Sequence, residues 1–220
     1  LRPIGMYNFV KKVHSEVKTP LDAHVHNDIG FALANAFAAC DAGVDQIHTT
    51  IDGIGERTGI PSLAETAVAL TYLYKSENDF RLDMLVDLSR LIEQYTEIKP
   101  YDSKPIVGSS AYKHKAGTHL AAVLKNTAAY EPINPRSVGN RRRIVFGELA
   151  GKTGAEYLMS LLGMKKDIDN AKNIAAGLKN LRMGDLLEIP LEEKRLEVVK
   201  ESTDGKVERW DTESRRDIDK

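Results

Sequence analysis

The 220-residue sequence has almost no cysteine and no long apolar run. Its single cysteine, Cys40, excludes a disulfide framework within the chain, so we expect a protein of the reducing cytoplasm. No segment approaches the roughly 20 apolar residues that a membrane-spanning helix needs. The N-terminus also has no apolar segment of the kind found in secretion signals. We therefore expect no membrane partner.

The sequence also lacks an excess of either charge, because 31 basic residues stand against 32 acidic ones, for a formal net charge of −1. Such a balance produces no overall field that would attract a polyanion, so we expect no nucleic-acid partner. The length is enough to bury a core. The composition thus favours a globular protein, and any function must be inferred from local motifs.

Helical and strand-like periods alternate at the start of the chain. Apolar residues of 6–18 fall on one helical stripe, whereas residues 19–26 switch to an alternating, strand-like pattern. An alanine-rich helix is predicted over 30–43, with Gly43 as its C-terminal stop, and a second strand over 44–51. This order predicts an α/β fold with parallel strands. Two strands cannot close a sheet, so we interpret the chain as a C-terminal fragment that carries the last βα units of a larger barrel.

Two more helices and a domain boundary are predicted next. Ser62 and Glu65 have the capping-box spacing that opens a helix, and Asp79 is predicted to cap another helix over 80–98. Residues 99–108 contain two prolines and no periodicity, so we place the domain boundary there.

The second half of the chain is predicted to be mainly helical. We expect a helix to start within 113–126, an irregular segment over 128–149, and two helices within 151–183. A strand is predicted in 195–201, and the charged end, 212–220, is expected to be disordered.

The stretch "LDAHVHND" places two histidines one residue apart. Side chains alternate faces along a strand, so Asp22, His24 and His26 share one face, with the Cα atoms of the histidines about 6.5 Å apart. Both imidazoles can then reach one divalent ion at about 2.0–2.1 Å per bond. We predict His24 and His26 as metal ligands, and Asp22 as a hydrogen-bond partner that orients an imidazole.

Other interpretations of this face remain open. It could be the solvent-exposed side of an edge strand, or part of an oxygenase-type centre with two histidines and a carboxylate. Asp22 could equally be a buried polar residue bonded to the backbone. His48 has no sequence partner at ligand spacing and is interpreted as structural, and His14 is expected to be solvated on the first helix.

A glycine-rich loop, "TIDGIGERTGI", follows the second strand and is predicted to lie at the same end of the sheet as the histidines. Glycine lets the backbone fold closely over a ligand. Glu56 and Arg57 are predicted to form a charge pair at the rim and to bind substrate. By itself this loop is a moderate signal, because many loops combine glycine with a salt bridge.

Together these motifs resemble those of a known family. The run "HVHNDIGFALANAFAACDAGVDQIHTTIDGIGERTGI" resembles the homocitrate synthase and 2-isopropylmalate synthase family of acyl-CoA condensing enzymes, whose pattern is H-x-H-N-D-x-G-x-A-x-A-N, a strand, and then G-x-G-E-R-x-G. The resemblance continues in "HKAGTHLAAVLKNTAAYEP" and covers roughly residues 1–160.

The resemblance implies a (β/α)8 TIM barrel followed by mainly helical linker subdomains. Residues 1–98 would carry the last βα units, 99–150 a linker subdomain that reaches the partner's active site, and 151–220 a helical subdomain with a partly disordered tail. The two histidine ligands would lie on strand seven. A third ligand, a carboxylate in an R-[DE]-G-E-Q motif, has no counterpart in this sequence. The 220-residue piece alone is therefore expected to be inactive.

The chemistry implied is a Claisen-type condensation of acetyl-CoA with a 2-oxo acid. A divalent ion (Zn, Mn, Mg or Co) polarises the 2-oxo group and fixes its orientation. A base takes a proton from the acetyl methyl group, the enolate attacks the polarised carbon, and thioester hydrolysis makes the step irreversible.

The resemblance also implies roles in proton transfer for His119 and Tyr130, in a homodimer whose subunits exchange the subdomains. His119 could instead pack at a subunit contact. His114 precedes it by five residues, so on one helix the two would point about 140° apart. The run Arg141–Arg143 could meet CoA phosphates, although such a run is more often a solvated face or a salt bridge within a subdomain.

Three features favour homocitrate synthase, which uses 2-oxoglutarate in lysine biosynthesis. Ile60 stands where related synthases usually carry an asparagine, "HKAG" resembles homocitrate synthases, and few residues follow Gly151 for a leucine-binding regulatory domain. "TIDGIGER" and "SLAETAVAL", however, look like 2-isopropylmalate synthase. That enzyme and citramalate synthase remain alternatives, as does a non-catalytic dimerisation fragment.

Overall fold

The computed structural model describes most of the chain in two compact units, Leu1–Gly108 and Ser109–Lys220. The described residues are 1–115, 117–146, 151–165, 167–179, 187–190, 197–201 and 207–211. The end of the chain that was predicted to be disordered, 212–220, lies outside them. Among the described residues, no helix combines the length and the apolar character needed to cross a bilayer.

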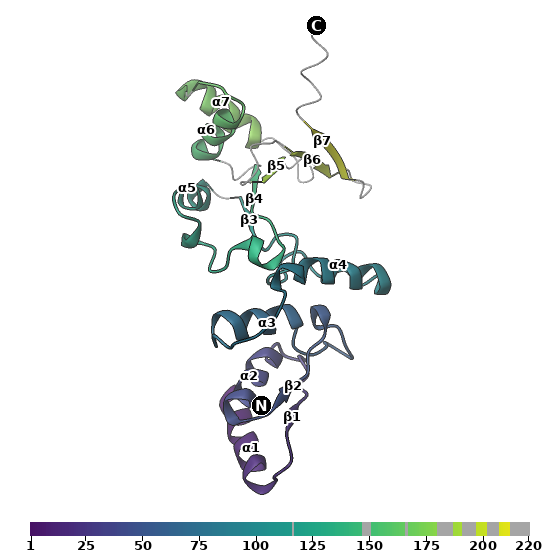
Figure 1. The fold of residues 1–220 in the computed structure, drawn as a ribbon. Coiled ribbons are helices and arrows are strands. Elements are labelled where there is room, and N and C mark those ends of the chain that lie inside the picture. Colours follow the sequence, from purple (N-terminus) through teal and green to yellow (C-terminus); the bar gives the residue numbers. More distant parts are fainter. Residues whose placement is uncertain are drawn as a thin grey trace. The chain divides into compact units, whose positions relative to one another are not determined.

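The first unit begins with the predicted order of helix, strand, helix and strand, which confirms the α/β class (Figure 1). The elements are α1 (Pro3–Glu16), β1 (Asp22–Ala23), α2 (Ala32–Ala42) and β2 (Gln46–Ile47). The strands pair in parallel, with Ala23 opposite Ile47. They are shorter than predicted, because in the described part of the chain each has one neighbour only and the ladder ends after two residues. The strands that the structure describes do not form a closed barrel.

Small side chains bring α2 close to β1. Ala39 and Ala42 are almost completely buried and pack with Ala23 and Val10. The helix ends as predicted at Gly43, which has a positive φ of 104° and donates its N–H to the carbonyl of Cys40. Glycine adopts this left-handed conformation without the strain of a side chain.

Two helices follow in the first unit, α3 (Leu63–Tyr72) and α4 (Leu85–Thr96), with short 3₁₀ turns at Ile51–Gly53 and Leu82–Met84. The cap of α3 is confirmed in position but not in its hydrogen bonds, and the cap of α4 is wrong. Ser62 stands at the N-cap of α3, but its hydroxyl caps no backbone N–H. The partner expected for it, Glu65, instead forms an ion pair with the buried Lys104, at 3.3 Å from Nζ to Oε1.

The second predicted cap fails because α4 starts later than expected. The 3₁₀ turn precedes it, and Met84 rather than Asp79 is its N-cap residue. The apolar stripe that predicted one long helix therefore spans a 3₁₀ turn as well as the α-helix.

In its described residues, the second unit contains a three-stranded sheet and three helices. The strands are β3 (Lys113–His114), β4 (Arg143–Phe146) and β5 (Leu187–Pro190), with β4 in the centre, parallel to β3 and antiparallel to β5. The helices are α5 (Gly117–Lys125), α6 (Lys152–Leu161) and α7 (Ile168–Lys179), and short 3₁₀ turns lie at Thr127–Ala129 and Pro135–Val138. A separate antiparallel pair is formed by β6 (Glu197–Glu201) and β7 (Val207–Asp211).

The predictions for this unit are confirmed in part. The two helices of 151–183 and the strand in 195–201 are present. The segment 128–149 is not irregular, because it contains β4, whose Ile144, Val145 and Phe146 are all buried. A strand buried on both faces shows no alternation, so its period could not be recognised.

Candidate functional site

The predicted histidine face is formed where β1 ends. Ala23 and Val25 are buried in clusters with residues of α2, whereas Asp22 and His24 are exposed and His26 is half-buried. This alternation confirms that the two histidines project to the side opposite the core.

The two imidazole rings lie close together, with centroids 5.1 Å apart and an interplanar angle of 67°. His24 Nε2 and His26 Nε2 are 3.3 Å apart. Two ligands held at about 2.1 Å from one ion, at angles between right and tetrahedral, stand about 3.0–3.4 Å apart, so the pair fits a divalent metal. Within the described residues, no set of three or more histidine, cysteine, aspartate or glutamate side chains could hold a metal. The pair thus supplies two ligands of an incomplete set.

His48 joins this pair through the fold, although the sequence offered it no partner at ligand spacing. Its Nδ1 lies 3.0 Å from Nδ1 of His24, and its Nε2 lies 3.7 Å from Oδ2 of Asp22. The register of β1 with β2 brings His48 beside His24, and its backbone N–H donates to the carbonyl of Ala23. Asp22 therefore contacts the imidazole of His48 rather than that of a predicted metal ligand.

The glycine-rich loop is packed tightly against the end of the histidine segment. The N–H of Asn27 donates to the carbonyl of Gly59 at 2.9 Å. Gly59 has a φ of 73°, and a Cβ built on it would lie 1.7 Å from the carbonyl oxygen of Gly53. The loop can close on itself only because both crossing residues lack side chains.

Alanine at Gly59 is expected to destabilise the first unit more than alanine at Gly30, a matched control. Gly30 also has a positive φ, of 82°, but nothing lies within 4 Å of its would-be Cβ. Both changes add left-handed strain of about 1–2 kcal/mol, and Gly59→Ala adds overpacking of about 1–3 kcal/mol. Urea titration of the two variants measures the difference in unfolding free energy. Equal losses would show that the loop crossing is not tight.

The rim charge pair differs from the prediction. Arg57 forms a two-pronged ion pair with Asp28, with Nε 2.7 Å from Oδ1 and Nη2 3.1 Å from Oδ2. Within the described residues, no such pair joins Arg57 to its neighbour Glu56, which is exposed. The hydrogen bond from Arg57 holds the pKa of the Asp28 carboxyl below its ordinary value. The pair thereby links the loop to the residue that follows the histidine segment.

A polar cavity of about 360 Å³ lies beside this loop. Its lining includes Asn27, Asp52 and the ion pair of the half-buried Glu65 with the buried Lys104, together with Ile60, which is 7% exposed. Polar groups therefore dominate the surroundings of Ile60.

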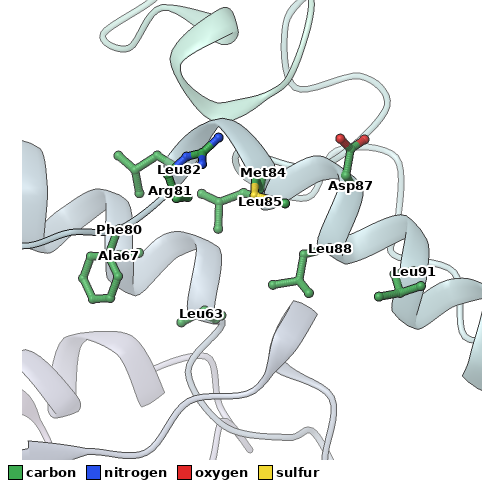
Figure 2. A pocket seen from close by; sticks show the side chains of 10 residues that line it. All are labelled: Leu63, Ala67, Phe80, Arg81, Leu82, Met84, Leu85, Asp87, Leu88 and Leu91. Carbon is green, nitrogen blue, oxygen red and sulfur yellow. The ribbon is translucent and has the colours of Figure 1, made fainter.

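A second pocket, of about 530 Å³, is apolar (Figure 2). Leu63 and Ala67 of α3 line it together with Leu88 and Leu91 of α4. The other lining residues are Phe80, Arg81, Leu82, Met84, Leu85 and Asp87. None of the predicted site residues belongs to this lining, so the pocket is not a candidate catalytic site.

In the second unit, the structure brings His119 and Tyr130 together. His119 lies near the start of α5 and Tyr130 directly follows the turn at Thr127–Ala129. Their rings stack with centroids 4.1 Å apart and an interplanar angle of 26°. Both side chains are exposed, so both could reach a substrate bound to another surface.

Glu131, the residue after Tyr130, belongs to a buried network that the sequence did not reveal. Glu131 accepts hydrogen bonds from Nε2 of His114, at 2.9 Å, and from the guanidinium of Arg142. Burial raises the pKa of the Glu131 carboxyl, but the bonds from Arg142 and His114 outweigh it and hold that pKa below its ordinary value. His114 lies on β3 and not on the helix of His119, so the predicted helical angle between them does not apply.

Of the run Arg141–Arg143, the central Arg142 therefore forms a salt bridge within the subdomain, which was one of the alternatives for this run. Arg142 is buried, whereas Arg141 is exposed. A spacing argument could not have found the partner, because Glu131 lies in a turn and approaches Arg142 only through the fold.

The comparisons with known proteins agree with this two-part organisation. Residues 1–93 match the HMGL-like family, and residues 106–185 match the family described as homocitrate synthase post-HMGL domain-like. The α/β unit and the unit that follows it are thus the two parts of one kind of protein. The chain belongs to the HMGL-like and homocitrate synthase family.

Relatives carry three different names. A "Probable 2-isopropylmalate synthase" of Methanopyrus kandleri is 41% identical over 82% of this chain and 36% of its own length. The homocitrate synthase AksA of the same organism is 36% identical over 97% of this chain and 53% of its own. The (R)-citramalate synthase CimA of Methanocaldococcus jannaschii is 36% identical over 94% of this chain and 42% of its own length. The chain thus spans between about a third and about half of these relatives.

Proposed function

We propose that this chain forms the last βα units and the linker subdomain of a TIM-barrel enzyme that condenses acetyl-CoA with a 2-oxo acid. The observation that carries the proposal is the pair of imidazoles whose Nε2 atoms face each other at 3.3 Å where β1 ends. The active sites of TIM-barrel enzymes lie at the C-terminal ends of the barrel strands, and these two histidines occupy such a position. Membership of the family, with relatives named as synthases, supports the same reaction class.

A divalent ion held by His24 and His26 would supply a Lewis acid for the 2-oxo group. The chain's own contribution is orientation. His48 contacts the outer nitrogen of His24 and is itself close to Asp22, so Asp22 acts on the pair through His48. Such outer partners fix the tautomer and the ring direction of a ligand.

His119 and Tyr130 are proposed to move the proton of the acetyl methyl group. A carbon acid of this kind needs both a base and a hydrogen-bond donor at the developing enolate oxygen. The stacked imidazole and phenol offer these two functions side by side. Because both are exposed, they suit delivery into the barrel of a second protomer, in a homodimer with exchanged subdomains.

The loop is proposed to bind substrate through Arg57 and Glu56. Arg57 is already fixed by Asp28, so its remaining donors are held in a defined direction. Within the reaction class, 2-oxoglutarate is the proposed 2-oxo acid, which would make homocitrate for lysine biosynthesis. The apolar Ile60 at the loop end and the "HKAG" stretch support this choice.

The test is His24→Ala in an enzyme that joins this chain to the rest of its barrel. Metal affinity is expected to fall by roughly 10-fold or more, because even outer partners of a ligand are worth about 10–100-fold. Release of free CoA thiol from acetyl-CoA should fall with it. The matched control is His14→Ala, which removes an exposed histidine of α1. Unchanged metal content after dialysis of the His24 variant would refute the site.

A further inference from the structure

Among the described residues, neither His119 nor Tyr130 belongs to a buried apolar cluster. Tyr130 is 46% exposed, and His119 is exposed as well. Exposed rings have more rotamers open to them than buried ones, because packing confines them less. Something beneath them must fix their backbones if they are to stay parallel.

The residue after Tyr130 is suited to that task. The side chain of Glu131 is 3% exposed and that of Arg142 is 8% exposed. Arg142 Nε lies 2.7 Å and 2.9 Å from the two carboxylate oxygens, and Nη2 also donates to Oε2. Nε2 of His114 donates to the remaining side of Oε1. The carboxylate is thus bound from two directions and cannot rotate without breaking buried charge-assisted bonds.

These bonds tie together the segments that carry the two rings. His114 ends β3, just before the start of α5 and His119. Arg142 directly precedes β4, which pairs with β3 through His114 and Ile144. Glu131 extends the turn that ends at Tyr130, and its N–H donates to Thr127 at 3.0 Å. One carboxylate therefore connects the turn of Tyr130 to both strands beneath it.

We infer that Glu131 is a positioning residue, which acts through His114 and Arg142 to hold the Tyr130 ring against the His119 ring. Its consequence for catalysis rests on the proposed function, in which those two rings move a proton. The positioning itself is a property of this chain and can be tested without turnover.

The first test is NMR of the 220-residue chain labelled at histidine. In the parent, the Tyr130 ring current should move the His119 ring protons upfield, and Tyr130→Leu supplies the unstacked reference. Glu131→Gln, which keeps size but removes charge, should lose most of that shift. Glu156→Gln is the control, because it removes a carboxylate of an exposed ion pair with Lys152 in the same unit.

Arg142→Lys provides a second, milder variant. It keeps the buried positive charge and loses only the planar fork, so it should fold and give an intermediate shift. Circular dichroism checks that each variant retains its helices. A folded Glu131→Gln or, if that variant does not fold, a folded Arg142→Lys with the parent's full shift would overturn the inference.

Kinetics in an enzyme containing this chain separate the inference from the proposed function. Glu131→Gln should lower kcat by roughly 10–100-fold, as small misplacements of reacting groups do, and leave KM for the 2-oxo acid unchanged. Glu131→Asp should restore part of kcat. A lost stack with unchanged kcat would contradict the proposed role of the two rings and leave the positioning intact. A retained stack with lowered kcat would overturn the positioning.

Discussion

Replacing His119 by alanine, in an enzyme that carries this chain, is expected to lower kcat by about 10²–10⁴-fold, the range that general acid–base catalysis supplies. KM for the 2-oxo acid should change little. The reason is that the proposed metal ligands belong to the unit Leu1–Gly108, whereas His119 belongs to Ser109–Lys220. Steady-state kinetics with each substrate varied in turn measure both constants.

Complementation tests whether His119 serves a second protomer. Mixed dimers of a His119→Ala subunit and a His24→Ala subunit would contain one site with intact ligands and an intact imidazole if subdomains are exchanged. Their activity should exceed that of either parent. Proven heterodimers no more active than the parents would contradict exchange, and a His119→Ala enzyme with unchanged kcat would contradict the role of the imidazole itself.

Local patterns predicted the parts of the site that depend on neighbouring residues. The alternation around His24 and His26 placed both imidazoles opposite the core, because strand geometry fixes the faces of residues two apart. Gly43 was recognised as a helix stop for a similarly local reason, since its left-handed conformation favours glycine. The parallel order of β1 and β2 also followed from the helix between them.

The remaining features arise from contacts between distant residues. His48 contacts His24 because of the strand register. Arg57 pairs with Asp28, 29 residues away, and not with its sequence neighbour Glu56. Glu65, the expected partner in the capping box, contacts Lys104, 39 residues further along the chain. Such choices among partners depend on which side chains the fold brings together, and spacing in the sequence carries no record of them.

The same limit applies to β4 and to the network beneath the stack. The sequence of β4, Arg-Ile-Val-Phe, is short and shows neither a helical nor an alternating pattern of apolar residues. Without that strand, His114 was placed on a helix and the link from Arg142 to Glu131 could not be inferred. The catalytic candidates His119 and Tyr130 were found by resemblance, whereas their supporting residues required the structure.

The enzyme is expected to prefer 2-oxoglutarate to 2-oxoisovalerate by at least about 100-fold in kcat/KM. A site built to hold a distal carboxylate rejects analogues that lack it by as much as about 10⁴–10⁵, because its polar groups are left unpaired. An apolar pocket for a branched chain discriminates less, since a missing methylene is worth only about 10–200-fold. The relatives include both a 2-isopropylmalate synthase and a homocitrate synthase, at similar identities of 41% and 36%. Sequence identity therefore does not decide which 2-oxo acid is preferred.

Ile60 provides the local argument for this preference. It is buried at the wall of a polar cavity, where the related synthases of the resemblance carry an asparagine. An isoleucine cannot act as an amide ligand, so a metal held by His24 and His26 would lack that ligand at this position. Measuring kcat/KM for both acids at saturating acetyl-CoA tests the preference. Ile60→Asn should reduce the preference for 2-oxoglutarate, while Ile51→Val, a conservative change outside the cavity lining, should not. A preference for 2-oxoisovalerate would refute the homocitrate assignment and leave the condensing chemistry in place.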